Sequence, residues 1–361
     1  LGYGITGQQD IGQGDYPALL LYTKSQEHAS YSLGEIENGK YVYYESYRPA
    51  AYNQDLTWER TTTYNAGMDF GFLNNRINFS LDYYYRLTKD LIAVVDVAAG
   101  MNFSNQVVSN IGSLSNQGAE LMFNAVAIDR KNFKWDLGLN ATYNVNKILS
   151  LTTGSDQNYY VETGGISSGT GNTIQRHQEG YAANTFWVYE TYKTENGYYE
   201  IVNQNGDKDA KGNDVIDEND LVAFHNPMAP LTLGLQSKMQ FCGFDFSFSL
   251  RSNIGNYVYN DVAAGKMSSL GTPVRSGGYT NIIKGTETTY AAISGSNTVS
   301  TGSNAYKMDI FVENASFLRI DNITLGYTFS KNPKINARIY ATVSNPVVIS
   351  GYSGLDPEVY G

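Results

Sequence analysis

An alternating run of side chains, Phe133–Val145 (FKWDLGLNATYNV), constrains the fold more than any other feature of this sequence. Every odd position from Phe133 to Val145 is apolar or aromatic, and every even position is polar, charged or glycine. Successive side chains of a strand point to opposite faces, so this run predicts a strand with one apolar and one polar face. The pattern returns along most of the chain, with aromatic residues towards the strand ends. That arrangement suits a wall between lipid and water better than a wall between a protein core and water.

The strands alternate between two kinds of connection. We predict strands at residues 1–7, Thr62–Phe72, Ile77–Leu87, Gly118–Ile128, Phe133–Val145, Leu231–Phe241, Phe244–Arg251, Ser316–Phe329, with a bulge near Asp321–Asn322, and Ile335–Val343. The short turns predicted between them are Leu73–Arg76, Asp129–Asn132, Cys242–Gly243 and Ser330–Lys334. The other connections, predicted to be irregular, are Gln8–Trp58, Thr88–Gln117 (in which 91–97 could extend a strand), Asn146–Pro230 and Ser252–Ala315. Tight turns at one end and long loops at the other are typical of outer-membrane barrels.

Composition narrows the class of protein further. The chain has 361 residues, with 30 Tyr, 36 Gly and 17% charged residues, which favours strands and turns. The sequence contains no apolar run of about 18 residues, so a membrane could be crossed only by a closed β-barrel. The net charge of −10 argues against a nucleic-acid partner, and the single Cys242 excludes an intrachain disulfide. We therefore predict an all-β, antiparallel transmembrane barrel.

Several phrases resemble the SusC/RagA-type TonB-dependent outer-membrane transporters. The resemblance is carried in order along the chain by residues Asn53–Ile92, Asn110–Leu121, Asn132–Leu151, Phe311–Phe329 and Val343–Val359, for example NIGSLSNQGAEL, FVENASFLRIDNITLGYTF and VSNPVVISGYSGLDPEV. Together these phrases cover almost the whole chain. Each phrase alone would be a weak signal, whereas the ordered set is specific.

The resemblance implies a barrel of about 22 strands closed by an N-terminal plug, located in the outer membrane of a Gram-negative bacterium. We expect residues 1–361 to form the C-terminal portion of this barrel, without the plug, the TonB box or the final strands. The resemblance further implies TonB-dependent import of oligosaccharides or peptides with a SusD-like surface lipoprotein. Two alternatives stay open, namely a soluble or surface-attached glycan-binding or adhesin β-protein and, closer to the favoured hypothesis, a passive porin.

Aromatic residues in the long connections are candidate platforms for substrate. A sugar's apolar face packs on an aromatic ring, while its hydroxyls require polar neighbours. The candidates are Tyr41, Tyr43, Tyr44 and Tyr47, then Tyr159 and Tyr160, then Phe186, Trp187, Tyr189 and Tyr192. The alternative is that these rings form loop cores or an interfacial belt.

An acidic loop, NQNGDKDAKGNDVIDEND at residues 203–220, is a candidate calcium site. Its alternating side-chain oxygens resemble those of calcium-binding loops, although no Glu occupies the closing position. The candidate ligands are Asn203, Asn205, Asp207, Asp209, Asp217 and Asp220. A solvated acidic turn is the alternative, and calcium is the one cofactor that the sequence indicates.

Catalytic motifs are missing from the sequence. His28, His177 and His225 are scattered over the long connections, and neither a nucleophile elbow nor a phosphate-binding loop is present. We therefore predict that the protein is not an enzyme. The charged residues predicted on the polar face, where they would line a barrel lumen, are Asp69, Asp82, Arg86, Glu120, Asp136, Asp245 and Arg251.

Overall fold

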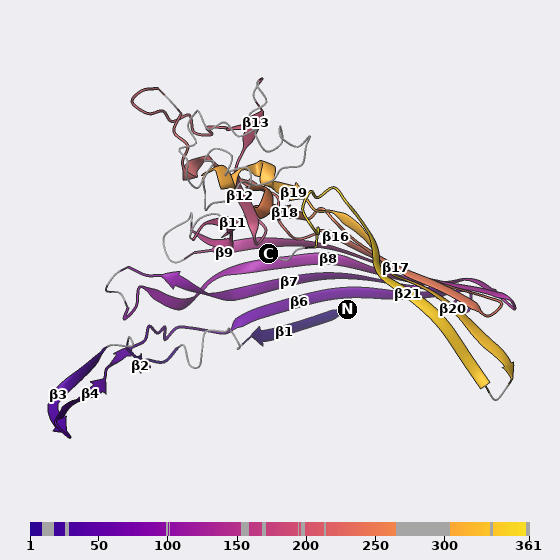
Figure 1. Cartoon of the computed structure of the whole chain (residues 1–361), viewed down its shortest axis with the longest axis horizontal. Helices are drawn as coiled ribbons and strands as arrows, with labels where there is room; N and C mark the ends of the chain where they lie inside the picture. Colours follow the sequence, from indigo (N-terminus) through magenta and orange to yellow (C-terminus); the bar gives the residue numbers. More distant parts are fainter. Residues whose placement is uncertain are drawn as a thin grey trace.

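The computed structural model describes residues 1–8, 18–25, 29–98, 100, 102–152, 159–167, 171–193, 195, 199–212, 214–264, 304–332 and 335–358. Its main element is one antiparallel nine-stranded sheet, in which each strand pairs with the next long strand along the chain (Figure 1). The strands are, in spatial order, β1 (Gly2–Gln8), β6 (Glu59–Phe72), β7 (Ile77–Asp96), β8 (Gln106–Arg130), β9 (Phe133–Leu151), β16 (Leu231–Phe241), β17 (Phe244–Ile254), β20 (Phe317–Asn332) and β21 (Ile335–Ser350). The predicted strands are therefore confirmed as one continuous up-and-down wall.

Tight turns join these strands at one end, which we call the turn end. Leu73, Asn74 and Asn75 adopt positive φ angles of 53°, 57° and 63° in the β6–β7 turn, as the Asn-Asn pair predicted. Cys242 and Gly243 do the same in the β16–β17 turn, with φ of 48° and 90°. The last predicted turn includes Pro333 and Lys334, which lie outside the described residues.

The predicted bulge in β20 is confirmed. The register with β21 shifts between Ile320 and Asn322, and the register with β17 shifts at the same point, so Asp321 has no partner in either ladder. An extra residue of this kind reverses the phase of the side chains without ending the strand. Leu318 and Ile323 accordingly belong to different phases of one strand.

At the opposite end, which we call the loop end, the suggested strand extension at 91–97 is confirmed, whereas the prediction that the rest of these connections is irregular was wrong. Strands β7 and β8 continue well past the predicted limits, and residues 97–105 alone connect them. The ladder persists because Val94 pairs with Val108, and because Val95 and Ile111 pack with Ile148 in a buried apolar cluster. Strands β7 and β8 therefore extend beyond the apolar band, and they occupy most of the connection predicted at Thr88–Gln117.

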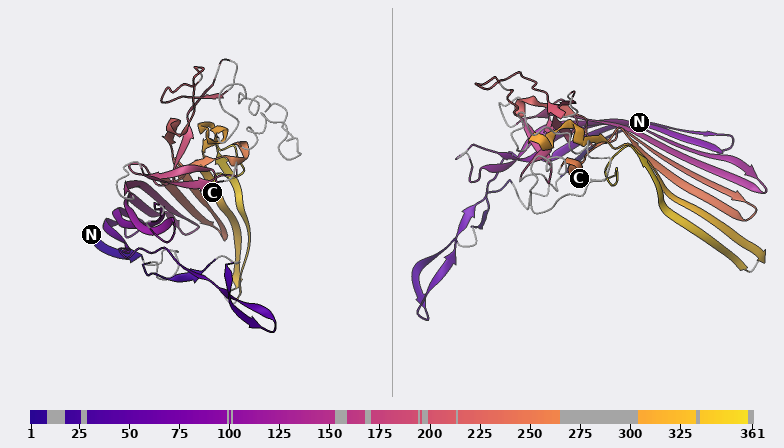
Figure 2. Two further views of the ribbon diagram at one scale, coloured as in Figure 1. Left: turned by 90° about the vertical axis from the view of Figure 1, so that its left-hand side faces the viewer. Right: turned by 45° about the horizontal axis from the view of Figure 1, so that its top comes forward.

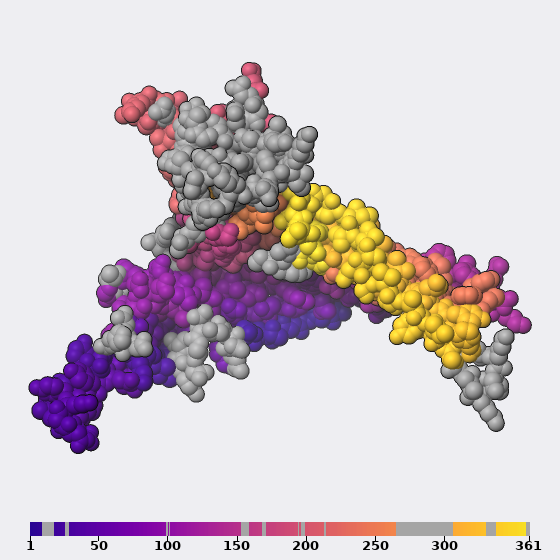
Figure 3. Space-filling model, viewed as in Figure 1, coloured from indigo at the N-terminus to yellow at the C-terminus, as the bar shows by residue number. Residues whose placement is uncertain are grey.

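The remaining connections also contain regular structure. Residues Gln8–Trp58 contain two antiparallel pairs, β2 (Tyr22–Lys24) with β5 (Tyr47–Pro49) and β3 (Ser30–Glu37) with β4 (Lys40–Glu45). The segments from 152 to 230 and from 255 to 316 contain β10 (Tyr160–Gly165), β11 (Thr173–Gln178), β12 (Thr185–Tyr189), β13 (Thr191–Lys193), β14 (Tyr199–Ile201), η1 (Glu218–Asp220), β15 (Leu221–Phe224), β18 (Tyr257–Tyr259), η2 (Asn304–Lys307), η3 (Asp309–Phe311) and β19 (Val312–Asn314). Strands β12, β13, β18 and β19 lie above the sheet in the view of Figure 1, whereas the β3–β4 hairpin projects away from the sheet, as Figure 3 also shows.

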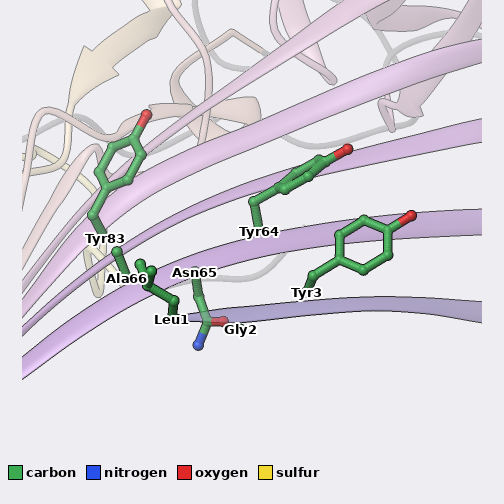
Figure 4. A pocket seen from close by; sticks show the side chains of 7 residues that line it. All are labelled: Leu1, Gly2, Tyr3, Tyr64, Asn65, Ala66 and Tyr83. Carbon is green, nitrogen blue, oxygen red and sulfur yellow. The ribbon is translucent and has the colours of Figure 1, made fainter.

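The two faces of the nine-stranded sheet differ as the alternation predicted. Figure 4 shows the rings of Tyr3, Tyr64 and Tyr83 on one side of the strands and Asn65 on the other. Along the apolar face, large side chains remain exposed, including Met68 at 63% and Leu81 at 47%. The face that would be buried in a soluble sandwich is therefore uncovered. Among the described residues, no helix is both long and apolar enough to cross a membrane.

Candidate functional site

The two long connections at the loop end pack together into one unit, which we call the loop body. Strands β10, β11, β12 and β15 form its four-stranded sheet, and Tyr189 of β12 forms a β-bridge with Met308 from the other connection. Phe186, Val188 and Phe311 are at most 2% exposed, so each side of this contact contributes to the apolar cores of the loop body. Figure 2 shows the loop body at one end of the long strands.

An arginine brings two of the predicted substrate residues together. The Arg176 guanidinium lies 4.0 Å from the ring centre of Tyr160 and 5.2 Å from that of Trp187, and both contacts are cation–π interactions. Tyr181 packs edge-on against Trp187 at 5.4 Å between ring centres. Glu162 is the nearest carboxylate, at 3.8 Å, which is an ion pair too long for a hydrogen bond.

This cluster, Tyr160, Glu162, Arg176, Tyr181 and Trp187, contains unused hydrogen-bond donors. Arg176 is 7% exposed, yet its Nη2 atom has no hydrogen-bond partner in the described part of the chain, and the same holds for the buried Trp187 Nε1. A buried donor without an acceptor costs free energy of about 1–3 kcal/mol. Each of these two atoms exposes less than 1 Å² of surface, so a ligand reaches the donors only if the cluster opens.

The other predicted aromatic residues of the loop body serve its packing. Tyr189 is 2% exposed and lies in the core with Met308, and burial raises the pKa of its hydroxyl to about 12. Phe186 is equally buried, and Tyr159 packs against the cluster at the loop ends of β8 and β9. Tyr192 remains half-exposed and donates to Glu200 at 2.6 Å. The Tyr189 and Phe186 rings are thus enclosed by protein in this structure.

The predicted tyrosines of the first connection lie elsewhere, on the β3–β4 hairpin and β5. Tyr41, Tyr43, Tyr44 and Tyr47 are between 44% and 64% exposed, and the Tyr44 hydroxyl donates to Glu35. These rings have solvent-exposed surface, as a binding platform requires. The structure does not bring them next to the Arg176 cluster.

The acidic loop satisfies its side chains locally. Asn203 and Asn205 accept from the backbone of Gly206 and Asp207, and Asp209 accepts from the backbone of Lys211. The buried Asp220 accepts from the backbone N–H groups of Gln204 (2.7 Å) and Asp217 (2.9 Å), and Asp217 caps the short helix η1 in return. Within the described residues, no group of three or more His, Cys, Asp or Glu side chains is arranged to hold a metal ion. Calcium binding by this loop stays a prediction.

The histidines have structural contacts. His177 Nε2 lies 2.8 Å from Asn184 Oδ1, and the His225 ring stacks on Tyr257 at 3.7 Å. Burial lowers the pKa of His225, so its ring is neutral in this stack at neutral pH. His28 lies outside the described residues.

Charged side chains on the polar face hold the segment that follows β21. Arg251 contacts Asp321 at 2.8 Å and Glu358 at 2.6 Å, and Arg319 contacts Asp356 at 2.6 Å. The Nε atom of Arg319 also lies 3.2 Å from Glu358, as an ion pair without hydrogen-bond alignment. Residues 351–358, which we call the return segment, are therefore fastened to the polar face of β17 and β20.

Sequence reasoning missed Arg176, Arg319 and the two acids of the return segment. Arg176 could have been found, because it lies two residues after the buried Ile174 on β11 and therefore shares the inward face of that strand. That strand lies inside a segment predicted to be irregular. The partners of Arg319, Asp356 and Glu358, are remote in sequence, so no local sequence pattern predicts these ion pairs.

The apolar face has a layered composition. Aromatic residues lie towards both ends of this face, with tyrosines at the loop end and mainly phenylalanines at the turn end, where Tyr327 also pairs with Phe244, and aliphatic pairs lie between them. The ladder pairs that show this are Tyr3 with Tyr64, Tyr64 with Tyr85, Leu81 with Leu121, Leu139 with Leu235, Phe70 with Phe79, and Phe241 with Phe244. Along β6 the distance from Tyr64 to Phe72 is roughly 27 Å at about 3.4 Å per residue. After strand tilt, this matches the apolar band of about 25 Å, with aromatic girdles, of outer-membrane barrels.

Comparison with known proteins assigns the class. Residues 25–345 match the family described as TonB dependent receptor-like, beta-barrel, and the chain belongs to this family. The protein is thus an outer-membrane β-barrel protein of Gram-negative bacteria, from a family of transporters.

Among its relatives, the chain is 46% identical to the TonB-dependent receptor SusC of Bacteroides thetaiotaomicron, over 99% of this chain and 35% of that protein. It is 27% identical to the TonB-dependent receptor P39 of Formosa agariphila, over 99% of this chain and 37% of that protein. The chain therefore spans little more than a third of the length of these relatives.

Solved structures agree on the fold. The RagAB peptide transporter superposes with a TM-score of 0.71 at 22% identity, covering 99% of this chain and 37% of that chain. The RagAB peptide importer in its open-open state superposes with a TM-score of 0.70 at 21% identity, again over 99% of this chain and 37% of that chain. The predicted barrel wall with one-sided loops is confirmed by this likeness.

Proposed function

We propose that this chain forms barrel wall and substrate-facing loops of a TonB-dependent importer of oligosaccharides or peptides. In this proposal a SusD-like surface lipoprotein closes over the loop body, and TonB acts through a plug domain outside the chain. The observation that carries the proposal is the uncovered apolar face of the nine-stranded sheet, bordered by two aromatic levels and joined to a folded loop body. The family membership and the 46% identity to SusC support it.

The loop body would supply the first contact for cargo. Oligosaccharides and peptides both present many oxygen acceptors and apolar faces, which would match the unused donors and the rings of the Arg176 cluster once this cluster opens to admit them. The exposed tyrosines of the β3–β4 hairpin offer a second platform. We propose that the protein transports its cargo without altering it, and its membership of a family of transporters supports this.

The two rival functions make different predictions. A soluble adhesin requires that a second layer covers the apolar face, yet Phe244 and Phe241 are 51% and 56% exposed. A passive porin would share the wall but would take up cargo without an energy source. The structural observations and the family therefore favour the importer.

Growth and uptake experiments test the proposal directly. A strain lacking the gene should lose growth on one class of oligosaccharide or peptide, and the complete gene should restore growth. Uptake of the labelled cargo should stop when TonB is deleted or the proton gradient is collapsed. Unchanged uptake in the TonB deletion would exclude the importer and favour the porin.

Calcium binding is tested separately from transport. Titration with calcium should raise the melting temperature if the acidic loop binds the ion, and Asp207→Ala or Asp209→Ala should remove that rise. No shift at millimolar calcium would end this proposal and leave the solvated acidic turn, which the local hydrogen bonds already describe.

A further inference from the structure

A cationic crevice lies at the turn end of the sheet, between two neighbouring hairpin turns. It has a volume of about 360 Å³ and lies between the β8–β9 turn and the β16–β17 turn. Its lining includes the basic residues Arg130, Lys131 and Lys134 and the aromatic residues Phe133, Phe241 and Phe244. All the strands beside the crevice are interior strands of the sheet, so its walls do not depend on either sheet edge.

Strand register places one of these cations on the lipid-facing side. Arg130 pairs with Phe133, Phe133 pairs with Phe241, and Phe241 pairs with Phe244. Directly opposed residues share a face of the sheet, so these four residues form one row on the apolar side. The next row towards the loop end is wholly apolar, since Trp135 pairs there with Ile128 and Met239. The row with Arg130 is thus the border of the apolar band.

The crevice is positively charged, and two of its basic side chains form no ion pair among the described residues. Arg130 and Lys131 are exposed, and neither belongs to an ion pair among the described residues. The acidic residue in the lining, Asp245, is held by Arg338 at 2.5 Å, and Lys134 lies 3.7 Å from Asp136. An arginine fork and an ammonium group beside exposed phenyl rings present cationic and apolar surface to the same ligand.

We propose that this crevice binds the headgroup of an anionic phospholipid of the inner leaflet. Short turns face the periplasm in outer-membrane barrels, so the turn end meets that leaflet. The phosphate contacts Arg130 and Lys131, and the acyl chains lie on Phe241 and Phe244. A free phosphate ion shares the first contact but has nothing to place on the rings. This inference rests on the membrane location and does not require any particular cargo.

Binding of defined lipids to the purified complete transporter tests the proposal. The probes are phosphatidylglycerol, phosphatidylcholine and inorganic phosphate, and the readouts are lipid retention in native mass spectrometry and the shift in melting temperature. Phosphatidylglycerol should be retained and should raise the melting temperature, whereas phosphatidylcholine and phosphate should do neither. The double variant R130Q/K131Q should bind phosphatidylglycerol roughly 25-fold more weakly, because each basic side chain near an anionic surface contributes about fivefold.

Lys40→Gln is a control for charge removal away from the crevice; it removes one positive charge, against two in the double variant, from the exposed β3–β4 hairpin. It should bind phosphatidylglycerol like the unmodified protein. Equal retention by the double variant and the control would overturn the proposal. An equal shift with inorganic phosphate alone would overturn the lipid as the source of the anion. Cargo uptake is measured in parallel, so that failure of the importer hypothesis is recognised separately.

Discussion

At the scale of single residues, Arg176 is buried in the loop body with its hydrogen-bonding capacity incompletely used, which folding stability alone does not explain. Arg176 is 7% exposed and its guanidinium lies against the rings of Tyr160 and Trp187, yet one nitrogen has no acceptor among the described residues. Removing one partner of an ion pair is costly when it leaves a buried charge unpaired, but the Glu162 side chain is 42% exposed and stays in contact with water when Arg176 is replaced. Buried polar groups that lack partners in natural proteins tend to lie at functional sites.

The Arg176→Met variant tests whether Arg176 serves cargo binding. We expect its melting temperature to be unchanged or raised, because the methionine packs between Tyr160 and Trp187 without an unsatisfied donor. We expect uptake of the cargo identified by the growth screen to fall about tenfold, the effect of losing one charge-assisted hydrogen bond. A lower melting temperature with undiminished uptake would assign Arg176 to the stability of the loop body alone.

The contact between Asp356 and Arg319 predicts a pH dependence of the return segment. The Arg319 guanidinium holds the pKa of Asp356 below its ordinary value of 3.8. A carboxylate whose pKa is lowered by folding contributes stability above its unfolded pKa, and that contribution is lost as the pH falls through the folded pKa. Hydrogen-exchange protection of residues 351–358 should therefore hold from neutral pH to about pH 4 and decrease in stronger acid.

The variant Asp356→Asn separates this contact from general acid unfolding. It should reduce protection of the return segment at neutral pH by a few-fold only, because Asp356 is 47% exposed and Glu358 still contacts Arg251 and the buried Arg319. Glu179→Gln, an exposed acid of the loop body, is the control and should leave the return segment unchanged. Equal protection in Asp356→Asn would show that the pair does not hold the segment.

At the scale of strands, glycines on the polar face allow close approach between neighbours. A Cβ atom at Gly118 of β8 would lie 2.4 Å from the Tyr143 carbonyl oxygen and 2.6 Å from the Tyr84 hydroxyl. Tyr84 lies across this glycine and donates to Asn144 of β9 at 2.9 Å. Because Gly118 has no side chain, Tyr84 of β7 can extend across β8 and donate its hydrogen bond to Asn144 of β9.

Gly118→Ala should lower the melting temperature of the barrel and weaken the Tyr84 cross-link, because the added methyl group displaces both backbone and ring. A cost of about 1–3 kcal/mol is expected for an overpacked position. Gly4→Ala in β1 is the matched control, since no atom lies within 4 Å of the place that its added methyl group would occupy. Heat-modifiable electrophoresis measures both, and equal melting of the two variants would contradict this role of Gly118.

The elements also show what sequence patterns could and could not predict. Leu231–Phe241 and the turn at Cys242 follow from local alternation and turn chemistry, and the structure has β16 with those bounds. The loop body was missed because its short strands are buried by contacts between segments far apart in sequence, such as Tyr189 with Met308. The cluster around Arg176 depends on the same remote contacts, so its rings could be proposed individually but not placed together.

At the scale of the whole molecule, the nine-stranded sheet is a sector of a barrel wall. Its spatial order begins with β1 and ends with β21, and each carries one edge of the sheet. The folded loop body stands at one end of the long strands (Figure 1), and the cationic crevice lies at the other, between two hairpin turns. Exposed apolar side chains between the two ends mark the surface that touches hydrocarbon.

Two arginine substitutions test most directly whether the apolar face of the nine-stranded sheet contacts lipid. Leu81 lies on the apolar face, paired with Met68 and Leu121, whereas the 56% exposed Met122 lies on the polar face, paired with Ser80 and Asn140. Unfolding of the complete transporter in lipid vesicles should show Leu81→Arg destabilised by about 2–4 kcal/mol, the cost of arginine at the bilayer midplane. Met122→Arg should change the stability by less than about 1 kcal/mol. Equal effects at the two positions would contradict a wall with lipid on one face and water on the other.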